Sequence, residues 1–238
     1  MDFKKIAKQF WENGYIVFEK FFPDELMDDY NQKIINHFES NPESELNSEF
    51  SDKSKVQVIP WFPYREGKPY FDGIDLDNKF NQITTSILKE EWNNLYCMMM
   101  YSKKGTIGQA WHQDCPPHES SKYNLNRLVY THDITDETGG SVIIYPKTHT
   151  KGELTIGDPH EDLEGQLVLK PKKGTVVFLH GHCWHRVTPA KQNRISSNFR
   201  AVPQGTPEDI TDVCVYRNMK YRFSTQEVIE ERKNNQKD

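Results

Sequence analysis

The chain has few cysteines, no surplus of basic residues and no long apolar run. Its four cysteines include no C-x-x-C pair, which is typical of a protein of the reducing cytoplasm. A net charge of −5 and a pI near 6.0 exclude the basic surface that binds nucleic acid or an anionic membrane. No stretch approaches a membrane span, and the opening residues 1–5 lack an apolar signal region. We therefore expect a soluble, cytoplasmic protein without nucleic-acid or membrane partners; its oligomeric state stays open.

The apolar content of the chain is sufficient for one core. Hydrophobic residues make up 35% of the 238 residues, charged residues make up 27%, and no internal repeat is visible. A chain of this length is typical of a single domain. We expect one domain over residues 1–238, with a helical N-terminal part over 1–91, a barrel core over about 92–216 and a polar C-terminal tail.

Helical spacing of apolar residues marks the start of the chain. Residues 2–13 place Phe3, Ile6 and Phe10 on one face, and Gly14 follows as a stop signal. The other expected elements are a strand over 15–18, helices from 23 to about 38 and over 78–90, a mobile loop over 40–55 near the mouth of the site, and a polar helix over 224–238.

The pattern changes to short strands from Leu95 to about Val215. Turns rich in glycine, proline and asparagine separate these strands. Helices followed by a strand-rich remainder favour a mainly β fold with flanking helices. The predicted architecture is a double-stranded β-helix, the jelly-roll (cupin-like) barrel, with the helices packed against one sheet.

A metal-ligand pattern runs through the strand-rich part. His112 and Asp114 form a His-x-Asp pair, and alternate residues of a strand point to the same face. The apolar run over 174–179 predicts a strand that delivers His185 at its end, so a third ligand comes from a separate strand. Two imidazoles and one carboxylate form the facial triad that holds Fe(II) with open positions. These three residues are the predicted metal ligands.

A carboxylate-binding pattern follows His185. In an extended strand Arg194 and Ser196 share one face, and the planar fork of an arginine suits bidentate capture of a carboxylate. The pair predicts a site for a dicarboxylate that chelates the metal at its other end. Arg200 also follows His185 and competes with Arg194 for this role.

Several segments carry a family resemblance. They are 13–18 (NGYIVF), 22–26 (FPDEL), 109–114 (QAWHQD), 138–149 (TGGSVIIYPKTH), 174–185 (GTVVFLHGHCWH) and 193–196 (NRIS). In these segments, and in their order, the chain resembles the phytanoyl-CoA dioxygenase-like family of Fe(II)/2-oxoglutarate-dependent oxygenases.

The resemblance implies a reaction and its cofactors. The predicted metal ligands are similar to the iron ligands of the family, and Arg194 with Ser196 is similar to the pair that binds the distal carboxylate of 2-oxoglutarate. Gln109 stands where such enzymes place a polar contact to this cosubstrate. The implied cofactors are Fe(II), 2-oxoglutarate and O2, with ascorbate as the reductant. The expected reaction hydroxylates an unactivated C–H of a small metabolite and releases succinate and CO2; desaturation and ring closure are the alternative outcomes. Related halogenases have alanine or glycine in place of Asp114, so the aspartate disfavours halogenation.

The substrate contacts are expected among aromatic and arginine side chains near the ligands. Such side chains favour a small, polar or carboxylate-bearing molecule over a fatty chain. The expected contacts are Trp111, Arg127, Tyr145 and Trp184, together with the aromatic cluster over 61–65.

Two other classes of protein are compatible with parts of the pattern. A metal-dependent cupin that acts as a hydrolase or isomerase has an H-x-H pair, which His180 and His182 provide. However, Arg186 stands where that pattern requires a carboxylate. The other class is a non-catalytic barrel that binds a small molecule. Outside these readings we expect His180 and His182 to lie at the surface or behind the metal ligands.

Overall fold

Two six-stranded antiparallel sheets form the body of the protein in the computed structural model, which describes residues 1–40, 58–66, 69–89 and 91–222. The major sheet has the order β1 (Tyr15–Phe18), β8 (Val176–His180), β5 (Leu125–Val129), β10 (Arg194–Pro203), β3 (Trp92–Ser102) and β2 (Val58–Trp61). The minor sheet has the order β12 (Lys220–Arg222), β11 (Val213–Tyr216), β4 (Gln109–Gln113), β9 (His185–Val187), β6 (Val142–Ile144) and β7 (Leu167–Leu169).

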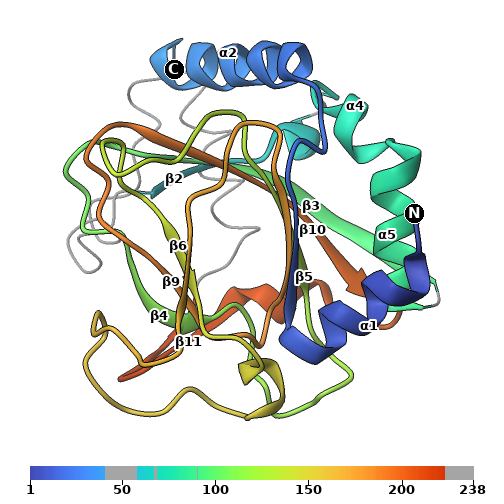
Figure 1. Ribbon diagram of the computed structural model, residues 1–238, viewed down its shortest axis with the longest axis vertical. Coiled ribbons are helices and arrows are strands. Elements are labelled where there is room, and N and C mark those ends of the chain that lie inside the picture. The colour runs from blue at the N-terminus through green and yellow to red at the C-terminus, as the bar shows by residue number, and fades with distance from the viewer. Residues whose placement is uncertain (41–57, 67–68, 90, 223–238) are drawn as a thin grey trace.

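The chain crosses repeatedly between the two sheets, as a jelly roll requires. Strands β3, β5, β8 and β10 belong to the major sheet, and β4, β6, β7 and β9 belong to the minor sheet (Figure 1). The predicted mainly β jelly roll is therefore confirmed. Among the described residues no strand pairing joins the sheets into a closed barrel, so the expected barrel is an open sandwich.

The helices lie beside the major sheet (Figure 1). None of the described helices is both long enough and apolar enough to cross a membrane. The α-helices are α1 (Phe3–Asn13), α2 (Asp24–Ser40), α4 (Asp72–Asp75) and α5 (Asn78–Leu88), and the short 3-10 helices are η1 (Pro63–Glu66), η2 (Thr148–Thr150) and η3 (Glu208–Asp212).

The ends of α1 follow the signals in the sequence. The Asp2 side chain accepts a hydrogen bond from the Lys5 amide, and Gly14 closes the helix with a left-handed φ of 81°. Helices α1, α2 and α5 and strand β1 match the predicted ranges within a few residues. Apart from Ser40, the predicted loop over 40–55 and the predicted tail helix lie outside the described residues. The division of the chain into one domain stays a prediction.

Alternation along β10 separates the apolar core from the polar interior. Ile195 and Phe199 pack in the core between the major sheet and the helices, beside Phe80 of α5 and Phe178 of β8. The alternate residues of β10 face the minor sheet and are polar and buried: Arg194, Ser196, Asn198 and Arg200. A strand with one apolar and one polar buried face is the reason why a functional site forms between the two sheets.

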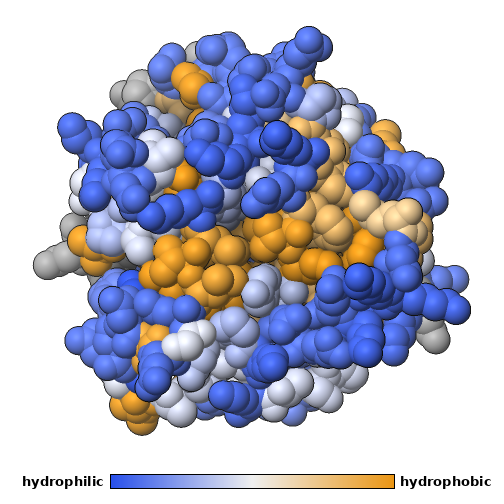
Figure 2. All heavy atoms as spheres, viewed as in Figure 1, coloured by the Kyte–Doolittle hydropathy of each residue, from blue (hydrophilic) through white to orange (hydrophobic). Residues whose placement is uncertain are grey.

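The open edges of the two sheets meet on one face of the molecule. Strand β1 ends the major sheet and β7 ends the minor sheet, and Figure 2 shows apolar residues gathered in the middle of this view, where these strands lie. Val168 of β7 is 46% exposed, and all four residues of β1 are half-buried. The apolar surface is therefore a consequence of the open sandwich.

The predicted strand over 174–179 is present as β8, but it does not carry His185. The chain leaves β8 at His180, turns, and enters the minor sheet with His185 as the first residue of β9. Gly181 makes the turn possible, because a Cβ atom there would lie 2.1 Å from the Asn124 Oδ1 atom. The sequence pattern therefore located the strand correctly, but it placed His185 at the end of this strand, whereas His185 begins the next one.

Arg127 lies on the helix-covered side of β5, which does not suit its predicted contact with the substrate. Its guanidinium group lies over the rings of Phe80 and Trp92 and pairs with the Asp75 carboxylate at 3.5 Å. Its side chain is fully buried. The physical reason is strand alternation, which turns Arg127 away from the neighbouring sheet. The arginine instead fastens α4 and α5 to the major sheet.

We predict that Arg127→Gln lowers the free energy of unfolding by about 3–5 kcal/mol, because it leaves the Asp75 carboxylate without its partner. Urea unfolding measures the change. Lys33→Met removes an exposed ion pair with Asp29 and should change the free energy little. Equal effects of the two substitutions would contradict the structural role of Arg127.

Candidate metal centre

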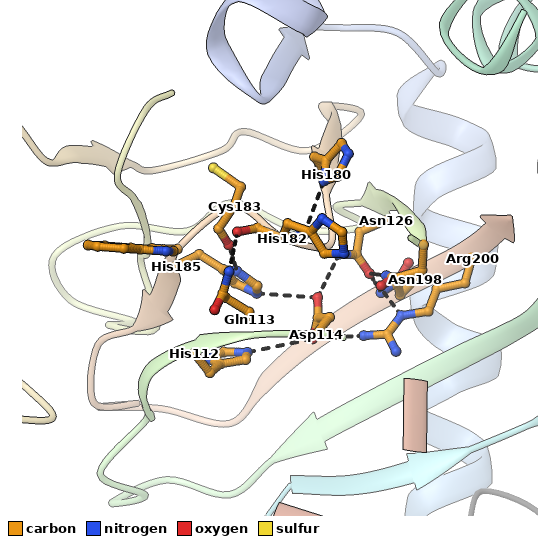
Figure 3. Close-up of polar contacts among 12 residues, drawn as sticks. His112, Gln113, Asp114, Asn126, His180, His182, Cys183, His185, Asn198 and Arg200 are labelled. Carbon is orange, nitrogen blue, oxygen red and sulfur yellow. Dashed lines mark hydrogen bonds and ion pairs between the residues drawn. The ribbon is translucent and has the colours of Figure 1, made fainter. Parts of the chain in front are cut away.

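The structure brings His112, Asp114 and His185 together between the sheets. His112 of β4 lies opposite His185 of β9 in the strand register, and Asp114 follows directly after β4. The His112 Nε2 atom lies 3.7 Å from Asp114 Oδ1, and the His185 Nε2 atom lies 3.4 Å from Asp114 Oδ2. One donor atom from each residue lies within 4.8 Å of the others, and all three side chains are buried (Figure 3).

Backbone carbonyls fix the orientation of both imidazole rings. His112 Nδ1 lies 2.8 Å from the Ala110 carbonyl oxygen, and His185 Nδ1 lies 2.9 Å from that of Cys183. Each Nδ1–H therefore donates to a carbonyl, and each Nε2 lone pair is left to bind a metal. Burial, together with His185, lowers the pKa of His112 to about 4 and keeps this ring neutral. Two imidazoles and a carboxylate are the donor set that fits Fe(II).

The carboxylate of Asp114 has two further partners that the sequence did not reveal. Burial alone would raise its pKa, but the Arg200 guanidinium and the two histidines outweigh burial and hold the pKa well below its usual range. Arg200 Nη2 lies 3.0 Å from Asp114 Oδ1, and Asn126 Nδ2 donates to Oδ2 at 2.6 Å. Alternation on β10 placed Arg200 on the inner face. Nothing in the sequence linked it to Asp114.

Arg194 lies at the other end of the inner face of β10. Its Nη1 donates to the Ser196 hydroxyl at 3.0 Å, and its Nε donates to the Gly140 carbonyl at 2.9 Å. Gly140 has a φ of 71°, and a Cβ atom there would lie 2.2 Å from Arg194 Cδ, so only glycine lets the backbone approach. Among the described residues no carboxylate pairs with Arg194. Burial without a counter-charge lowers its pKa.

A small cavity lies beside Arg194, between the two sheets. Strands β3, β4, β9 and β10 contribute to its walls, and Val187 in the wall is two residues along β9 from His185. Gln109, for which a polar contact to the cosubstrate was predicted, also lines this cavity. The lining residues are Met100, Ser102, Thr106, Gly108, Gln109, Val187, Thr188, Ala190 and Arg194.

The three predicted aromatic contacts lie on the outer side of the minor sheet. Trp111 points away from His112, and its indole N–H donates to the Glu161 carbonyl at 2.8 Å. Trp184 packs in the same cluster, and the Tyr145 ring packs against it with the centroids 5.9 Å apart. This cluster stabilises the covering loop over 151–166. The position does not suit the predicted contact with a substrate between the sheets.

His180 and His182 are buried, so of the two positions expected for them the surface is excluded. The His182 amide donates to His180 Nδ1 at 3.1 Å, and the His180 ring stacks on Tyr123 with the centroids 4.2 Å apart. Burial lowers the pKa of His182 to about 4 and that of His180 well below its usual value. In the described ranges only His112, Asp114 and His185 form a group that can hold a metal.

The geometry agrees with what sequence comparison finds. The chain belongs to the phytanoyl-CoA dioxygenase (PhyH) family, which it matches over residues 10–200. No curated protein matches the chain by sequence.

Solved structures with the same fold include two proteins that hold a metal ion together with the 2-oxo acid. The chain is 14% identical to the epimerase SnoN in complex with Fe3+, alpha ketoglutarate and nogalamycin RO, with a TM-score of 0.66 over 90% of this chain and 86% of that one. It is also 14% identical to HygX from Streptomyces hygroscopicus with nickel and 2-oxoglutarate bound, with a TM-score of 0.64 over 86% of this chain and 88% of that one. A complex of HygX with nickel, 2-oxoglutarate and hygromycin B is 13% identical, with a TM-score of 0.60 over the same shares.

The buried histidines predict a dependence of stability on pH. The pKa of His112, His132 and His182 is about 4 in the folded protein and 6.5 for an ordinary histidine, chiefly because of burial. Between these values the unfolded chain binds protons that the folded chain does not. The free energy of unfolding therefore falls as the pH falls through this window. Urea unfolding of chelator-treated protein at about pH 7 and about pH 5 measures the fall.

His182→Gln provides the matched test of this prediction, because it removes one of the buried rings but leaves the three predicted metal ligands in place. The dependence on pH should become shallower by about one proton. A free energy of unfolding that is equal at both pH values in the unmodified protein would contradict the prediction.

Proposed function

We propose that the protein is an Fe(II)- and 2-oxoglutarate-dependent oxygenase. The observation that carries the proposal is the combination of a buried two-histidine, one-carboxylate donor set with a buried arginine that has no carboxylate partner among the described residues. A buried unpaired cation is costly, so the position of Arg194 favours an anionic ligand. The PhyH family supports this reading, as do similar folds that bind iron or nickel together with the 2-oxo acid.

Different residues of this chain would act at the two ends of the cosubstrate. His112, Asp114 and His185 would hold Fe(II), which supplies the activation of O2 when bound. Arg194 would receive the distal carboxylate of 2-oxoglutarate in its planar fork, and the Ser196 hydroxyl would add a hydrogen bond. Arg194 and Gln109 both line the small cavity, which would receive this end of the cosubstrate.

The finer reaction that we propose is hydroxylation of an unactivated C–H of a small metabolite, with release of succinate and CO2 and with ascorbate as reductant. One protein of similar fold is an epimerase, so the fold also supports another outcome. The position of Arg186 weighs against a cupin hydrolase or isomerase. Its guanidinium lies over Trp111 on the outer side of β9 and pairs with Asp162, so position 186 supplies no metal ligand.

The first experiment measures succinate. Protein treated with a chelator is incubated in air with Fe(II), ascorbate and 2-oxoglutarate, and we expect slow formation of succinate that requires Fe(II). His112→Ala should abolish it, because two donors hold Fe(II) poorly. A non-catalytic barrel would bind 2-oxoglutarate without forming succinate. If the metal-loaded protein neither forms succinate nor binds 2-oxoglutarate, the proposed function is wrong.

We predict that Arg194→Lys weakens the binding of 2-oxoglutarate at least about tenfold, because the ammonium keeps the charge but loses the bidentate fork. Titration of the metal-loaded protein with 2-oxoglutarate measures the affinity. Arg217→Lys is the control, since Arg217 is equally buried but pairs with Glu161 outside the cavity. Unchanged affinity in Arg194→Lys would remove Arg194 from the site.

A further inference from the structure

A second buried arginine is directly bonded to a predicted metal ligand. The side chains of Arg200 and Asp114 are 7% and 8% exposed, and Nη2 lies 3.0 Å from Oδ1. Figure 3 shows His112 and His185 on one side of Asp114 and Arg200 on the other. Asp114 therefore faces its two histidine neighbours and a permanent cation at the same time.

The guanidinium of Arg200 is held rigidly where it meets the carboxylate. Its Nε donates to Asn126 Oδ1 at 2.8 Å, and its Nη1 donates to the Tyr96 hydroxyl at 2.7 Å. The Tyr96 hydroxyl lies in turn 3.2 Å from that of Thr211. Three different acceptors for three nitrogen atoms leave the planar group little freedom to rotate away from Asp114.

Asn126 holds the second oxygen of the same carboxylate. Its Oδ1 accepts hydrogen bonds from Arg200 and from the side-chain amides of Asn124 and Asn198, at 2.7 to 3.1 Å. This pattern requires the amide orientation in which Nδ2 donates to Asp114 Oδ2. Both carboxylate oxygens are therefore fixed by the major sheet, while the two histidines belong to the minor sheet.

The arginine and a metal ion compete for one negative charge. A divalent ion that binds Asp114 shares the carboxylate with Arg200, and two cations on one buried carboxylate repel each other. Without a metal ion, Arg200 supplies the counter-charge that a buried carboxylate requires. The pair therefore stabilises the ligand set before the metal binds and opposes the binding itself.

We propose that Arg200 is a positioning residue that holds Asp114 toward the two histidines and lowers the affinity of the centre for divalent metal. The inference rests on the proposed function, because it takes the three residues as metal ligands. It assigns opposite roles to two arginines on one face of β10. Arg194 would bind the anionic cosubstrate, whereas Arg200 is paired with Asp114 inside the metal site.

A purely structural salt bridge would behave differently. Its loss would loosen the contact between the sheets, disorder Asp114 and weaken both the fold and the binding of metal. The role that we propose predicts opposite signs for these two quantities. Loss of the positive charge destabilises the metal-free protein, because Asp114 stays buried without a partner, but it strengthens the attraction between Asp114 and a metal ion.

The test is titration of chelator-treated protein with Co(II), followed by the visible absorption of the bound ion and by the melting temperature. Arg200→Gln should bind Co(II) roughly tenfold more tightly than the unmodified protein. Without metal it should melt at a lower temperature than the unmodified protein. Addition of Co(II) should raise its melting temperature more than that of the unmodified protein. Arg217→Gln removes another buried arginine outside the centre, so it should lower the melting temperature and leave the Co(II) affinity unchanged.

Each outcome of this titration decides the matter. The role of Arg200 is overturned if Arg200→Gln folds and binds Co(II) as tightly as the unmodified protein or more weakly. It is also overturned if Arg217→Gln raises the Co(II) affinity as much as Arg200→Gln does. If Arg200→Gln does not fold, Arg200→Lys is decisive. It keeps the charge, so its Co(II) affinity should stay within roughly threefold of the original, and a tenfold change overturns the proposal.

Failure of the proposed function has its own signature in the same experiment. The metal centre itself is wrong if the unmodified protein does not bind Co(II), or if His112→Ala binds it equally well. The role of Arg200 is then overturned as well. If the unmodified protein binds Co(II) and His112→Ala does not, only the comparison between the Arg200 variants decides the inference.

Discussion

The buried carboxylate of Asp114 is the group around which the interior of the protein is organised. A negative charge between two sheets is tolerated only with charged or hydrogen-bonding partners. Arg200 and Asn126 supply them from the major sheet, and His112 and His185 face it from the minor sheet. The open sandwich can therefore hold a polar centre without losing its main apolar core, because the larger apolar cluster lies on the other side of the major sheet.

Strand β10 carries both the arginine that faces the cavity and the arginine that pairs with Asp114. Its inner face carries Arg194 at one end and Arg200 near the other, and its outer face supplies Phe199 to the core under the helices. Packing on the outer face fixes the register, and the register then fixes where both arginines point. The same alternation explains why one arginine meets a resident carboxylate and the other meets a cavity.

Several assignments depended on which face of a strand a side chain occupies. Alternation predicted that Arg194 and Ser196 lie together, and they share a hydrogen bond of 3.0 Å. Alternation did not predict which face Arg127 and Trp111 occupy. A strand that is buried on both faces shows no polar–apolar pattern that distinguishes its inner face from its outer face. Both side chains lie on the outer faces, where aromatic rings and backbone carbonyls satisfy them.

The sequence alone determined the local features: the helices, the His-x-Asp pair, the later histidine and the alternation of β10. These depend on spacing along the chain, which the sequence contains in full. The tertiary structure decided that His185 opens a strand of the minor sheet and that Arg200 bonds to Asp114. Those contacts join residues far apart in sequence, and only the pairing and packing of the two sheets bring them within hydrogen-bond distance.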